Sequence, residues 1–208
     1  MKAYVVGGDK NLVNFLPELE IIDNVKDANI VVFGDGPVVS PSLYKEKKHA
    51  AVTEKCDINR DRADKAIYVK LNSKQTAVGI GRGACFLAVM NGASLIQKID
   101  RDNTISCPVN FKYRDKMFIF DVLTDQKQSI NLKDCDKYEL VSNTKTTRKY
   151  YTDDVDTERF MNYNGDPEVV IFSKEKGPKS VCIQFHPEWL PDSTMSKILK
   201  QVIYGCNS

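Results

Sequence analysis

The sequence has few of the residues that usually build metal centres or disulfide frameworks. It contains only two histidines, His49 and His186, and its six cysteines are scattered without a C-x-x-C pair. In a chain of 208 residues, scattered cysteines are typical of reduced cytosolic thiols rather than of disulfides or a zinc site. We therefore expect a cytoplasmic protein that needs no metal and no cofactor.

The chain also lacks a long apolar run and a large excess of positive charge, and these two absences bear on which partners it can have. No apolar run approaches the roughly 20 residues that a membrane-spanning helix needs, and residues 1–8 are typical of a first strand rather than of a signal peptide. The 30 Lys and Arg side chains are nearly balanced by 28 Asp and Glu, so the formal net charge is only +2. Neither a membrane nor a nucleic acid is therefore expected as a partner.

Short apolar runs alternate with helical patterns through the first half of the chain. Residues 30–33 are apolar at every position, as expected for a strand that is buried on both faces of a sheet. Such alternation is typical of a parallel sheet with helices on both faces, and the charged run over residues 60–64 predicts a solvated, ion-paired helix start. The expected strands cover 3–7, 19–22, 29–33 and 76–80, and the expected helices cover 9–16, 41–48, 60–66 and 83–91.

The second half has a different pattern, with shorter strands separated by charged turns. Residues 144–160 are rich in charge and threonine and predict a loop. Since the chain shows no repeat, linker or low-complexity tract, residues 1–208 are expected to form one domain. The expected strands here cover 105–111, 117–123, 138–142, 168–172 and 181–185, followed by an amphipathic helix over 193–204 that Gly205 ends.

A strand, a tight turn and a helix meet within residues 77–95, AVGIGRGACFLAVMNGASL. This arrangement usually presents a nucleophile at the tip of the turn, where neighbouring glycines let the backbone bend sharply. Here the tip is Gly81, which has no side chain. The segment therefore has the form of a catalytic turn without its reactive group.

Two other segments form a pattern with this turn. Residues 33–44, FGDGPVVSPSLY, follow a buried strand, and their glycines and prolines fix a loop whose backbone N–H groups can converge on one point. Residues 184–189, QFHPEW, follow the last buried strand. Within them, His186 and Glu188 are two residues apart, so on an extended segment their side chains lie on the same side.

In this order, the three segments resemble the class I glutamine amidotransferase superfamily, and more closely its γ-glutamyl hydrolase-type branch, the peptidase C26-like proteins. That branch carries a glycine loop followed by a P-x-L-Y-like stretch, a G-I-C-R-G-x-Q turn and a Q-x-H-P-E strand end. The likeness covers most of the chain but is poor over residues 100–160. With the alternating pattern, it implies a flavodoxin-like, three-layer α/β domain with a central, mostly parallel sheet and an antiparallel extension in the second half.

The resemblance also implies a set of catalytic positions. In such a site a thiolate attacks the γ-carbonyl of a glutamine or γ-glutamyl group, a histidine transfers the proton, a carboxylate orients the histidine, and two backbone N–H groups hold the oxyanion. Carried over by position, His186 is the base and Glu188 the orienting acid. Gly36 and Arg82 are the oxyanion donors, and Gly81 stands at the nucleophile position.

Three departures from the family pattern concern this chemistry. Gly81 cannot form a thioester, Cys85 stands where the family has a glutamine that contacts the substrate, and residues 141–146 lack the histidine of the family's S-x-H stretch. Loss of a nucleophile alone lowers the rate by several orders of magnitude. We therefore interpret the chain as a catalytically inactive relative. It would act by binding a γ-glutamyl-like ligand, or by docking on a synthetase, a ligase or another enzyme that it regulates.

Other interpretations stay open at this stage. The chain could be an enzyme whose nucleophile was replaced at Gly81, and which supplies ammonia from glutamine to a partner ligase or cleaves γ-glutamyl amides. Cys85 could serve as a relocated nucleophile, although it lies one helical turn beyond the tip and most buried cysteines are inert. A structural interaction module would need no pocket at all.

Overall fold

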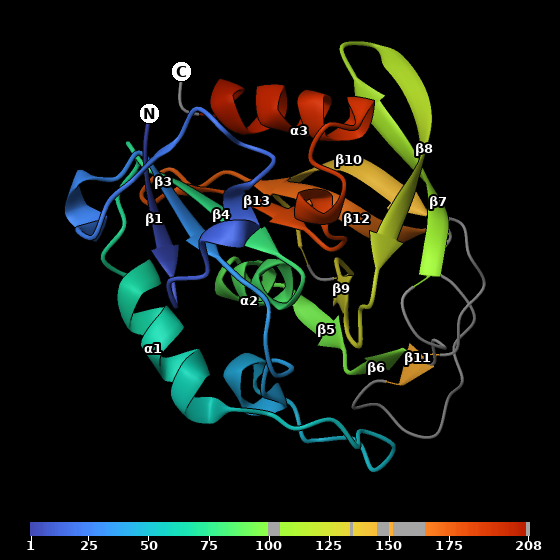
Figure 1. Cartoon of the computed structure of the whole chain (residues 1–208). Helices are drawn as coiled ribbons and strands as arrows, with labels where there is room; N and C mark the ends of the chain where they lie inside the picture. The colour runs from blue at the N-terminus through green and yellow to red at the C-terminus, as the bar shows by residue number, and fades with distance from the viewer. Residues whose placement is uncertain (100–104, 134, 145–149, 152–164, 207–208) are drawn as a thin grey trace.

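The computed structural model describes residues 1–99, 105–133, 135–144, 150–151 and 165–206, and Figure 1 shows how its elements are arranged. Among these residues, nine strands form one large sheet. From one edge to the other, the strands are β2 (Glu20–Ile21), β1 (Lys2–Val6), β3 (Ile30–Phe33), β4 (Thr76–Ile80), β13 (Lys179–Ile183), β12 (Asp166–Phe172), β10 (Tyr138–Thr144), β7 (Ile105–Tyr113) and β8 (Lys116–Thr124).

The two halves of this sheet differ in strand direction. Neighbouring strands are parallel from β2 to β13 and antiparallel from β13 to β8. β13 comes late in the sequence but pairs with β4, so it joins the second half of the chain to the parallel half of the sheet. The predicted flavodoxin-like α/β fold, with a mostly parallel centre and an antiparallel extension, is confirmed.

Both faces of the sheet are covered, as the alternating pattern predicted. Side chains of a strand point alternately to its two faces, and in β3 Ile30 and Val32 enter one core while Val31 and Phe33 enter the other. A strand buried in this way has no solvent-facing position, which explains why all four of its residues are apolar.

The α-helices form the outer layers of this arrangement. α3 (Thr194–Gly205) packs on one face, and α1 (Ile58–Tyr68) and α2 (Arg82–Met90) pack on the other (Figure 1). α3 begins where the Ser193 side chain accepts the backbone N–H of Ser196. None of the helices in the described ranges is both long enough and apolar enough to cross a membrane.

Two of the expected helices are short 3-10 turns, η1 (Lys10–Val13) and η3 (Pro41–Tyr44). Pro17 disfavours helical backbone at Leu16, so a helix over the whole of the expected range 9–16 is not favoured. η3 stops at Lys45, which adopts a left-handed φ of 66°. Further 3-10 turns that the sequence did not predict are η2 (Val25–Asp27) and η4 (Pro187–Trp189).

Two small ribbons accompany the large sheet. β5 (Ser94–Ile96) pairs with β9 (Ser129–Asn131), and β6 (Lys98–Ile99) pairs with β11 (Tyr150–Tyr151). These strands have two or three residues each, too few to show a period in the sequence. β11 corrects the loop predicted over 144–160, whose other residues beyond β10 lie outside the described part of the chain.

Candidate functional site

Three loops converge at the carboxyl ends of β3, β4 and β13. Because these strands are parallel neighbours, the residues that follow them leave the sheet at the same edge. Gly36 follows β3, Gly81 follows β4 and His186 follows β13. A pocket of about 170 Å³ lies here, and Gly36, Gly81, Arg82 and Cys85 all line it.

The remaining walls of this pocket come from residues that the sequence analysis missed. Most of them are polar or charged. Asp35 lies between the two glycines of the first loop, which is a signal that could have revealed it. Residues 125–128 follow β8, in the part of the chain where the family resemblance is poor. The missed residues are Asp35, Val38, Asp125, Gln126, Lys127 and Gln128.

Gly81 has the backbone geometry of a turn that presents a side chain. Its φ is 57° and its ψ is −118°, and its N–H donates to the Ile183 carbonyl at 2.9 Å. An ideal Cβ on this backbone lies 3.0 Å from His186 Cε1 and 2.9 Å from Asp35 Oδ1. A side chain at this position would therefore reach the histidine ring, as a nucleophile beside its base must.

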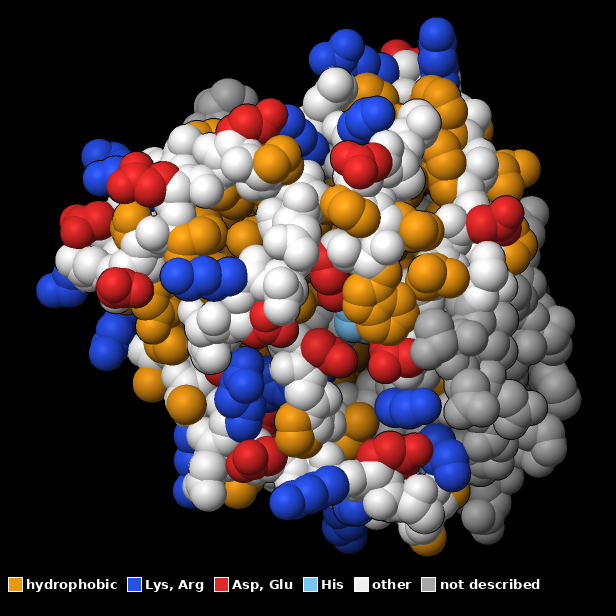
Figure 2. Space-filling model, in the orientation of Figure 1, with side chains coloured by type: hydrophobic (Ala, Val, Ile, Leu, Met, Phe, Trp, Pro, Cys, Tyr) orange, Lys and Arg blue, Asp and Glu red, His pale blue; other side chains and the backbone are white. Residues whose placement is uncertain are grey.

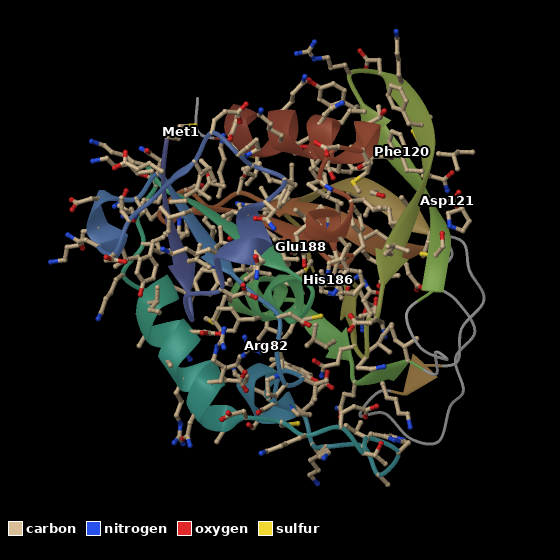
Figure 3. All side chains as sticks on the ribbon, in the orientation of Figure 1. Met1, Arg82, Phe120, Asp121, His186 and Glu188 are labelled. Carbon is tan, nitrogen blue, oxygen red and sulfur yellow. The ribbon has the colours of Figure 1, made fainter. Side chains whose placement is uncertain are left out.

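His186 is fixed by contacts on both ring nitrogens. Its Nδ1 lies 2.7 Å from Glu188 Oε1, so the two side chains are in contact as their spacing predicted. Its Nε2 lies 2.9 Å from Asp125 Oδ1, and the ring stacks on Trp189 with a centroid separation of 4.0 Å. Figure 3 shows His186 next to Glu188 near the centre of the molecule, and Figure 2 shows a histidine at the bottom of a hollow with acidic side chains at its edge.

The surroundings of His186 favour its protonated form. Burial alone would lower the pKa of this ring, but the hydrogen bond and charge of Glu188, with the charges of Asp35 and Asp125, outweigh it. The pKa of His186 is therefore raised above its ordinary value of 6.5. Three carboxylates thus surround one imidazole, which is more negative charge than a protonated histidine balances.

The predicted oxyanion donor at Arg82 already has an acceptor. Its backbone N–H donates to Asp35 Oδ1 at 3.0 Å, at the first residue of α2, where unpaired N–H groups attract anions. An oxyanion formed at this position would have to displace the Asp35 carboxylate. Gly36, the other predicted donor, lines the same pocket.

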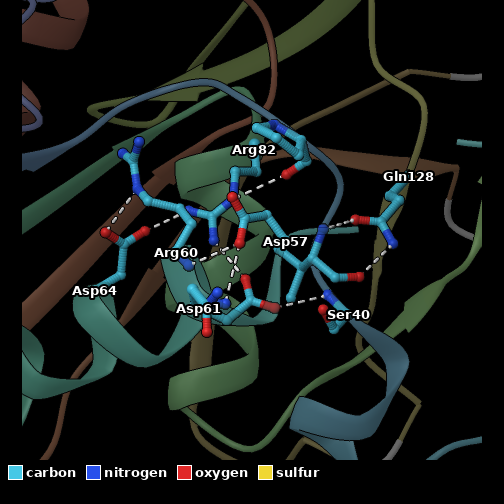
Figure 4. A network of polar contacts seen from close by, with 10 residues as sticks. Ser40, Asp57, Arg60, Asp61, Asp64, Arg82 and Gln128 are labelled. Atoms are coloured by element: carbon cyan, nitrogen blue, oxygen red, sulfur yellow. Dashed lines mark hydrogen bonds and ion pairs between the residues drawn. The ribbon is translucent and has the colours of Figure 1, made fainter. Parts of the chain in front are cut away.

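The Arg82 side chain is held by a buried network that Figure 4 shows. Its guanidinium pairs with Asp61 and Asp64 of α1, and its Nε donates to the Pro37 carbonyl at 3.0 Å. Asp61 also accepts the Ser40 N–H at 3.0 Å. The network therefore ties α1 and the start of α2 to the loop after β3.

The prediction of a solvated helix start over residues 60–64 was wrong for its two aspartates. Asp61 and Asp64 are both 0% exposed. Buried carboxylates need a counter-charge, and both pair with Arg82, 21 and 18 residues further along the chain. Asp64 also pairs with Arg60 at 2.9 Å, so the predicted ion pairing within the helix start is confirmed for these two residues. Local sequence cannot reveal a partner at that distance. Because both carboxylates pair with it, the guanidinium is not available to a ligand.

The geometry of Cys85 disfavours the idea of a relocated nucleophile. Its thiol donates to Gln184 Oε1 at 3.7 Å. Burial raises the pKa of this thiol to about 12. A thiol with such a pKa is almost wholly protonated at neutral pH, and only the thiolate is nucleophilic.

Comparison with known proteins places this geometry in a family. A model of the Peptidase C26 family matches residues 12–188, whereas no curated protein matches the chain. One similar solved structure is a GMP synthase component of Thermoplasma acidophilum, with a TM-score of 0.63 and 15% identity over 99% of this chain and 94% of that one. Another is a glutamine amidotransferase of Thermotoga maritima, with a TM-score of 0.52 and 13% identity over 99% of this chain and 94% of that one.

At such low identity the two structures show the shared fold alone. The family match is more specific, because it covers most of the chain and extends from η1 to the end of the His186–Glu188 pair. With the loop after β3, the turn at Gly81 and this pair at one edge of the sheet, the chain belongs to the Peptidase C26 family, within the class I glutamine amidotransferase-like superfamily.

Proposed function

We propose that this protein does not carry out the thioester chemistry of its superfamily and acts by binding a small γ-glutamyl-like ligand in the pocket beside Gly81. The observation that carries the proposal is the direction of the missing side chain. A Cβ at position 81 would lie 3.0 Å from His186 Cε1, so the position from which a nucleophile would face the proposed base carries no acyl-accepting atom. Without that atom no covalent intermediate forms at this turn.

Two carboxylates strengthen this interpretation. Asp35 accepts the N–H of Arg82 that would hold an oxyanion. Asp125 lies 2.9 Å from His186 Nε2, the ring nitrogen that does not contact Glu188. Asp35 therefore occupies the position of the oxyanion, and Asp125 occupies the position of the proton that would be transferred.

The chemistry of the pocket supports a polar ligand of amino-acid size. Its volume is about 170 Å³, and most of the residues that line it are polar or charged. A purely structural interaction module would need no such pocket, and apolar side chains could fill the space. Lys127 offers a positive charge to an α-carboxylate, and Asp35 and Asp125 offer negative charges to an α-ammonium group. A γ-glutamyl group carries both of these charged groups and an amide.

The first test is incubation of the protein with glutamine and with γ-glutamyl amides, followed by measurement of released ammonia or amine. We expect no release above the buffer background, and calorimetric binding of the amides. Lys127→Ala should weaken this binding by at least about 10-fold, since a charged hydrogen bond contributes roughly 1.5–3 kcal/mol. Lys116→Ala, an exposed lysine at the far end of β8, is the matched control. Turnover well above background would contradict the proposal.

The alternative of a replaced nucleophile has its own discriminating variant, Gly81→Cys. A thiol at this position would face His186 but would meet Asp35 Oδ1, 2.9 Å from the Cβ. We expect no glutamine hydrolysis from Gly81→Cys alone, because Asp35 also occupies the Arg82 N–H. Hydrolysis by this single variant would show a competent pocket and favour an enzyme whose nucleophile was replaced.

A partner enzyme is a second role that one comparison favours. The Thermoplasma acidophilum structure is one component of a synthase. By analogy, docking on a synthetase or ligase is proposed for this chain as well. Ligand binding and docking are compatible, because the pocket occupies only one edge of the sheet.

A further inference from the structure

Three side chains with metal-binding atoms converge beside Gly81. One carboxylate oxygen from each of Asp35 and Asp125 and one ring nitrogen of His186 all lie within 4.8 Å of one another. Asp125 Oδ1 and His186 Nε2 are 2.9 Å apart. Two ligands at about 2.1 Å from a divalent cation are roughly 3 Å apart when they lie at right angles. The pair already has the spacing of neighbouring ligands.

The second ring nitrogen of His186 has the partner that metal-binding histidines usually have. Such a histidine donates its other N–H to a carboxylate, which fixes the tautomer and the ring orientation. Here Nδ1 lies 2.7 Å from Glu188 Oε1, and the Glu188 side chain is only 8% exposed. With Nδ1 directed at Glu188, Nε2 is the ring atom on the side of Asp125, and a cation bound there would take the place of the Nε2 proton. The stack on Trp189 holds the ring in this orientation.

The charge balance around the ring also favours a cation. Glu188 and Asp125 contact the two ring nitrogens of His186 at 2.7 and 2.9 Å, and a carboxylate oxygen of Asp35 lies within 4.8 Å of the ligand atoms of Asp125 and His186. The buried guanidinium that lines this pocket, Arg82, is already paired with two aspartates of α1. The other cationic side chain that lines the pocket is the exposed Lys127. A divalent cation would therefore add positive charge beside carboxylates that Arg82 does not neutralise.

Gly81 places no side chain beside two of the candidate ligands. A Cβ at this position would lie 2.9 Å from Asp35 Oδ1 and 3.0 Å from His186 Cε1, between two of the three candidate ligands. Asp35 Oδ1 is steadied by the Arg82 N–H, and a carboxylate has further acceptor positions on its two oxygens. The adjoining pocket gives room for water ligands.

We propose that Asp35, Asp125 and His186 bind one divalent cation, of the kind that accepts two carboxylates and one imidazole, such as Mn²⁺ or Zn²⁺. This departs from the expectation of a metal-free protein, which rested on cysteine and histidine spacing. It goes beyond the proposed function and does not depend on it, because it requires only these three side chains and not a γ-glutamyl ligand.

The test uses the full chain after treatment with EDTA. Mn²⁺ is added stepwise, and free Mn²⁺ is followed by its electron paramagnetic resonance signal, which decreases on binding. Mn²⁺ prefers oxygen and nitrogen ligands, so the cysteines do not interfere. We expect one bound Mn²⁺ per chain, displaced by Zn²⁺. Asp35→Asn and Asp125→Asn should each weaken binding by at least about 10-fold, the range typical for disturbed metal sites.

Asp121→Asn is the matched control, since Asp121 is an exposed aspartate of β8 and its substitution removes the same charge outside the pocket. This variant should bind Mn²⁺ like the unchanged protein. Thermal unfolding of each variant shows that the fold is retained, which is expected because Asp35 is exposed and Asp125 half-buried. Absence of binding to the unchanged chain would overturn the proposal, as would binding that both pocket variants retain. Neither result depends on the glutamine assay.

Discussion

Asp35 occupies the space into which any side chain at position 81 would point, because an ideal Cβ there lies 2.9 Å from its Oδ1. The same carboxylate accepts the Arg82 N–H at 3.0 Å, a donor that would otherwise lack a partner at the start of α2. The absence of a side chain at Gly81 and the position of the Asp35 carboxylate are therefore linked. The carboxylate can lie there because residue 81 has no Cβ, and a Cβ at residue 81 is disfavoured because the carboxylate lies there.

This link predicts the effect of Gly81→Ala. The variant combines a left-handed φ of 57° with a close approach to Asp35, so it should lower the free energy of unfolding by about 1–3 kcal/mol. Gly8→Ala is the control, because Gly8 has a φ of 79° and nothing within 4 Å of its Cβ, so it shows backbone strain alone. Urea unfolding measures the free energy of unfolding of both variants. Equal losses for Gly81→Ala and Gly8→Ala would mean that the Asp35 carboxylate does not disfavour a side chain at position 81.

At the scale of elements, the network around Arg82 decides how the helices meet the site. Its guanidinium joins α1 to α2, and its Nε bond to Pro37 joins both to the loop after β3. The capping side chain of Asp57, which accepts the N–H groups of Asn59 and Arg60, starts α1 at this point. Three segments that are distant in sequence are thus held at one end of the pocket.

Removal of the Arg82 guanidinium leaves the buried Asp61 without a counter-charge and leaves Asp64 with Arg60 alone. Arg82→Met should therefore lower the free energy of unfolding by about 3–5 kcal/mol. Arg62→Met, at an exposed position of α1, should change it by less than about 0.5 kcal/mol. Chemical denaturation of both variants provides the comparison. A small loss for Arg82→Met would show that α1 and α2 are held by apolar packing rather than by this network.

At the scale of the whole molecule, the pocket has one wall from each half of the sheet. The parallel half supplies Gly36, Gly81 and Arg82, whereas residues 125–128 follow β8 at the antiparallel edge. The backbone N–H of His186 donates to the backbone carbonyl of Leu123 at 3.0 Å. This bond joins the two halves of the sheet at the site. The antiparallel extension therefore closes the pocket as well as enlarging the sheet.

Gln128 connects the two walls through its buried amide. Its Oε1 accepts the Val39 N–H at 2.8 Å, and its Nε2 donates to the Val39 carbonyl at 3.0 Å (Figure 4). Gln128→Ala would leave both backbone groups unpaired, at about 1–3 kcal/mol for each group. We expect faster hydrogen exchange at the Val39 amide and unchanged exchange at the amides of β3. Unaltered exchange at Val39 would show that the walls are held together by other contacts.

Local patterns predicted those parts of the site that are encoded by neighbouring residues. The turn at Gly81 and the pair of His186 and Glu188 could be recognised because each lies within a few residues of sequence. The roles of Asp61 and Asp125 could not be recognised in this way. Asp61 pairs with Arg82, 21 residues away, and Asp125 contacts His186, 61 residues away. Charged residues of this kind look like solvated surface until the chain is folded.

The sequence by itself determined the strands of the parallel half, the helices α1 and α2, the family and the absence of a nucleophile at the tip of the turn, because each depends on short-range periodicity or on one residue's chemistry. Only the tertiary structure decided that Asp35 and Asp125 enter the site and that Arg82 is neutralised by α1. Asp35 and Asp125 reach the site because the fold brings distant loops together. Arg82, Asp61 and Asp64 pair because they share a low-dielectric interior, where every charge must find a partner.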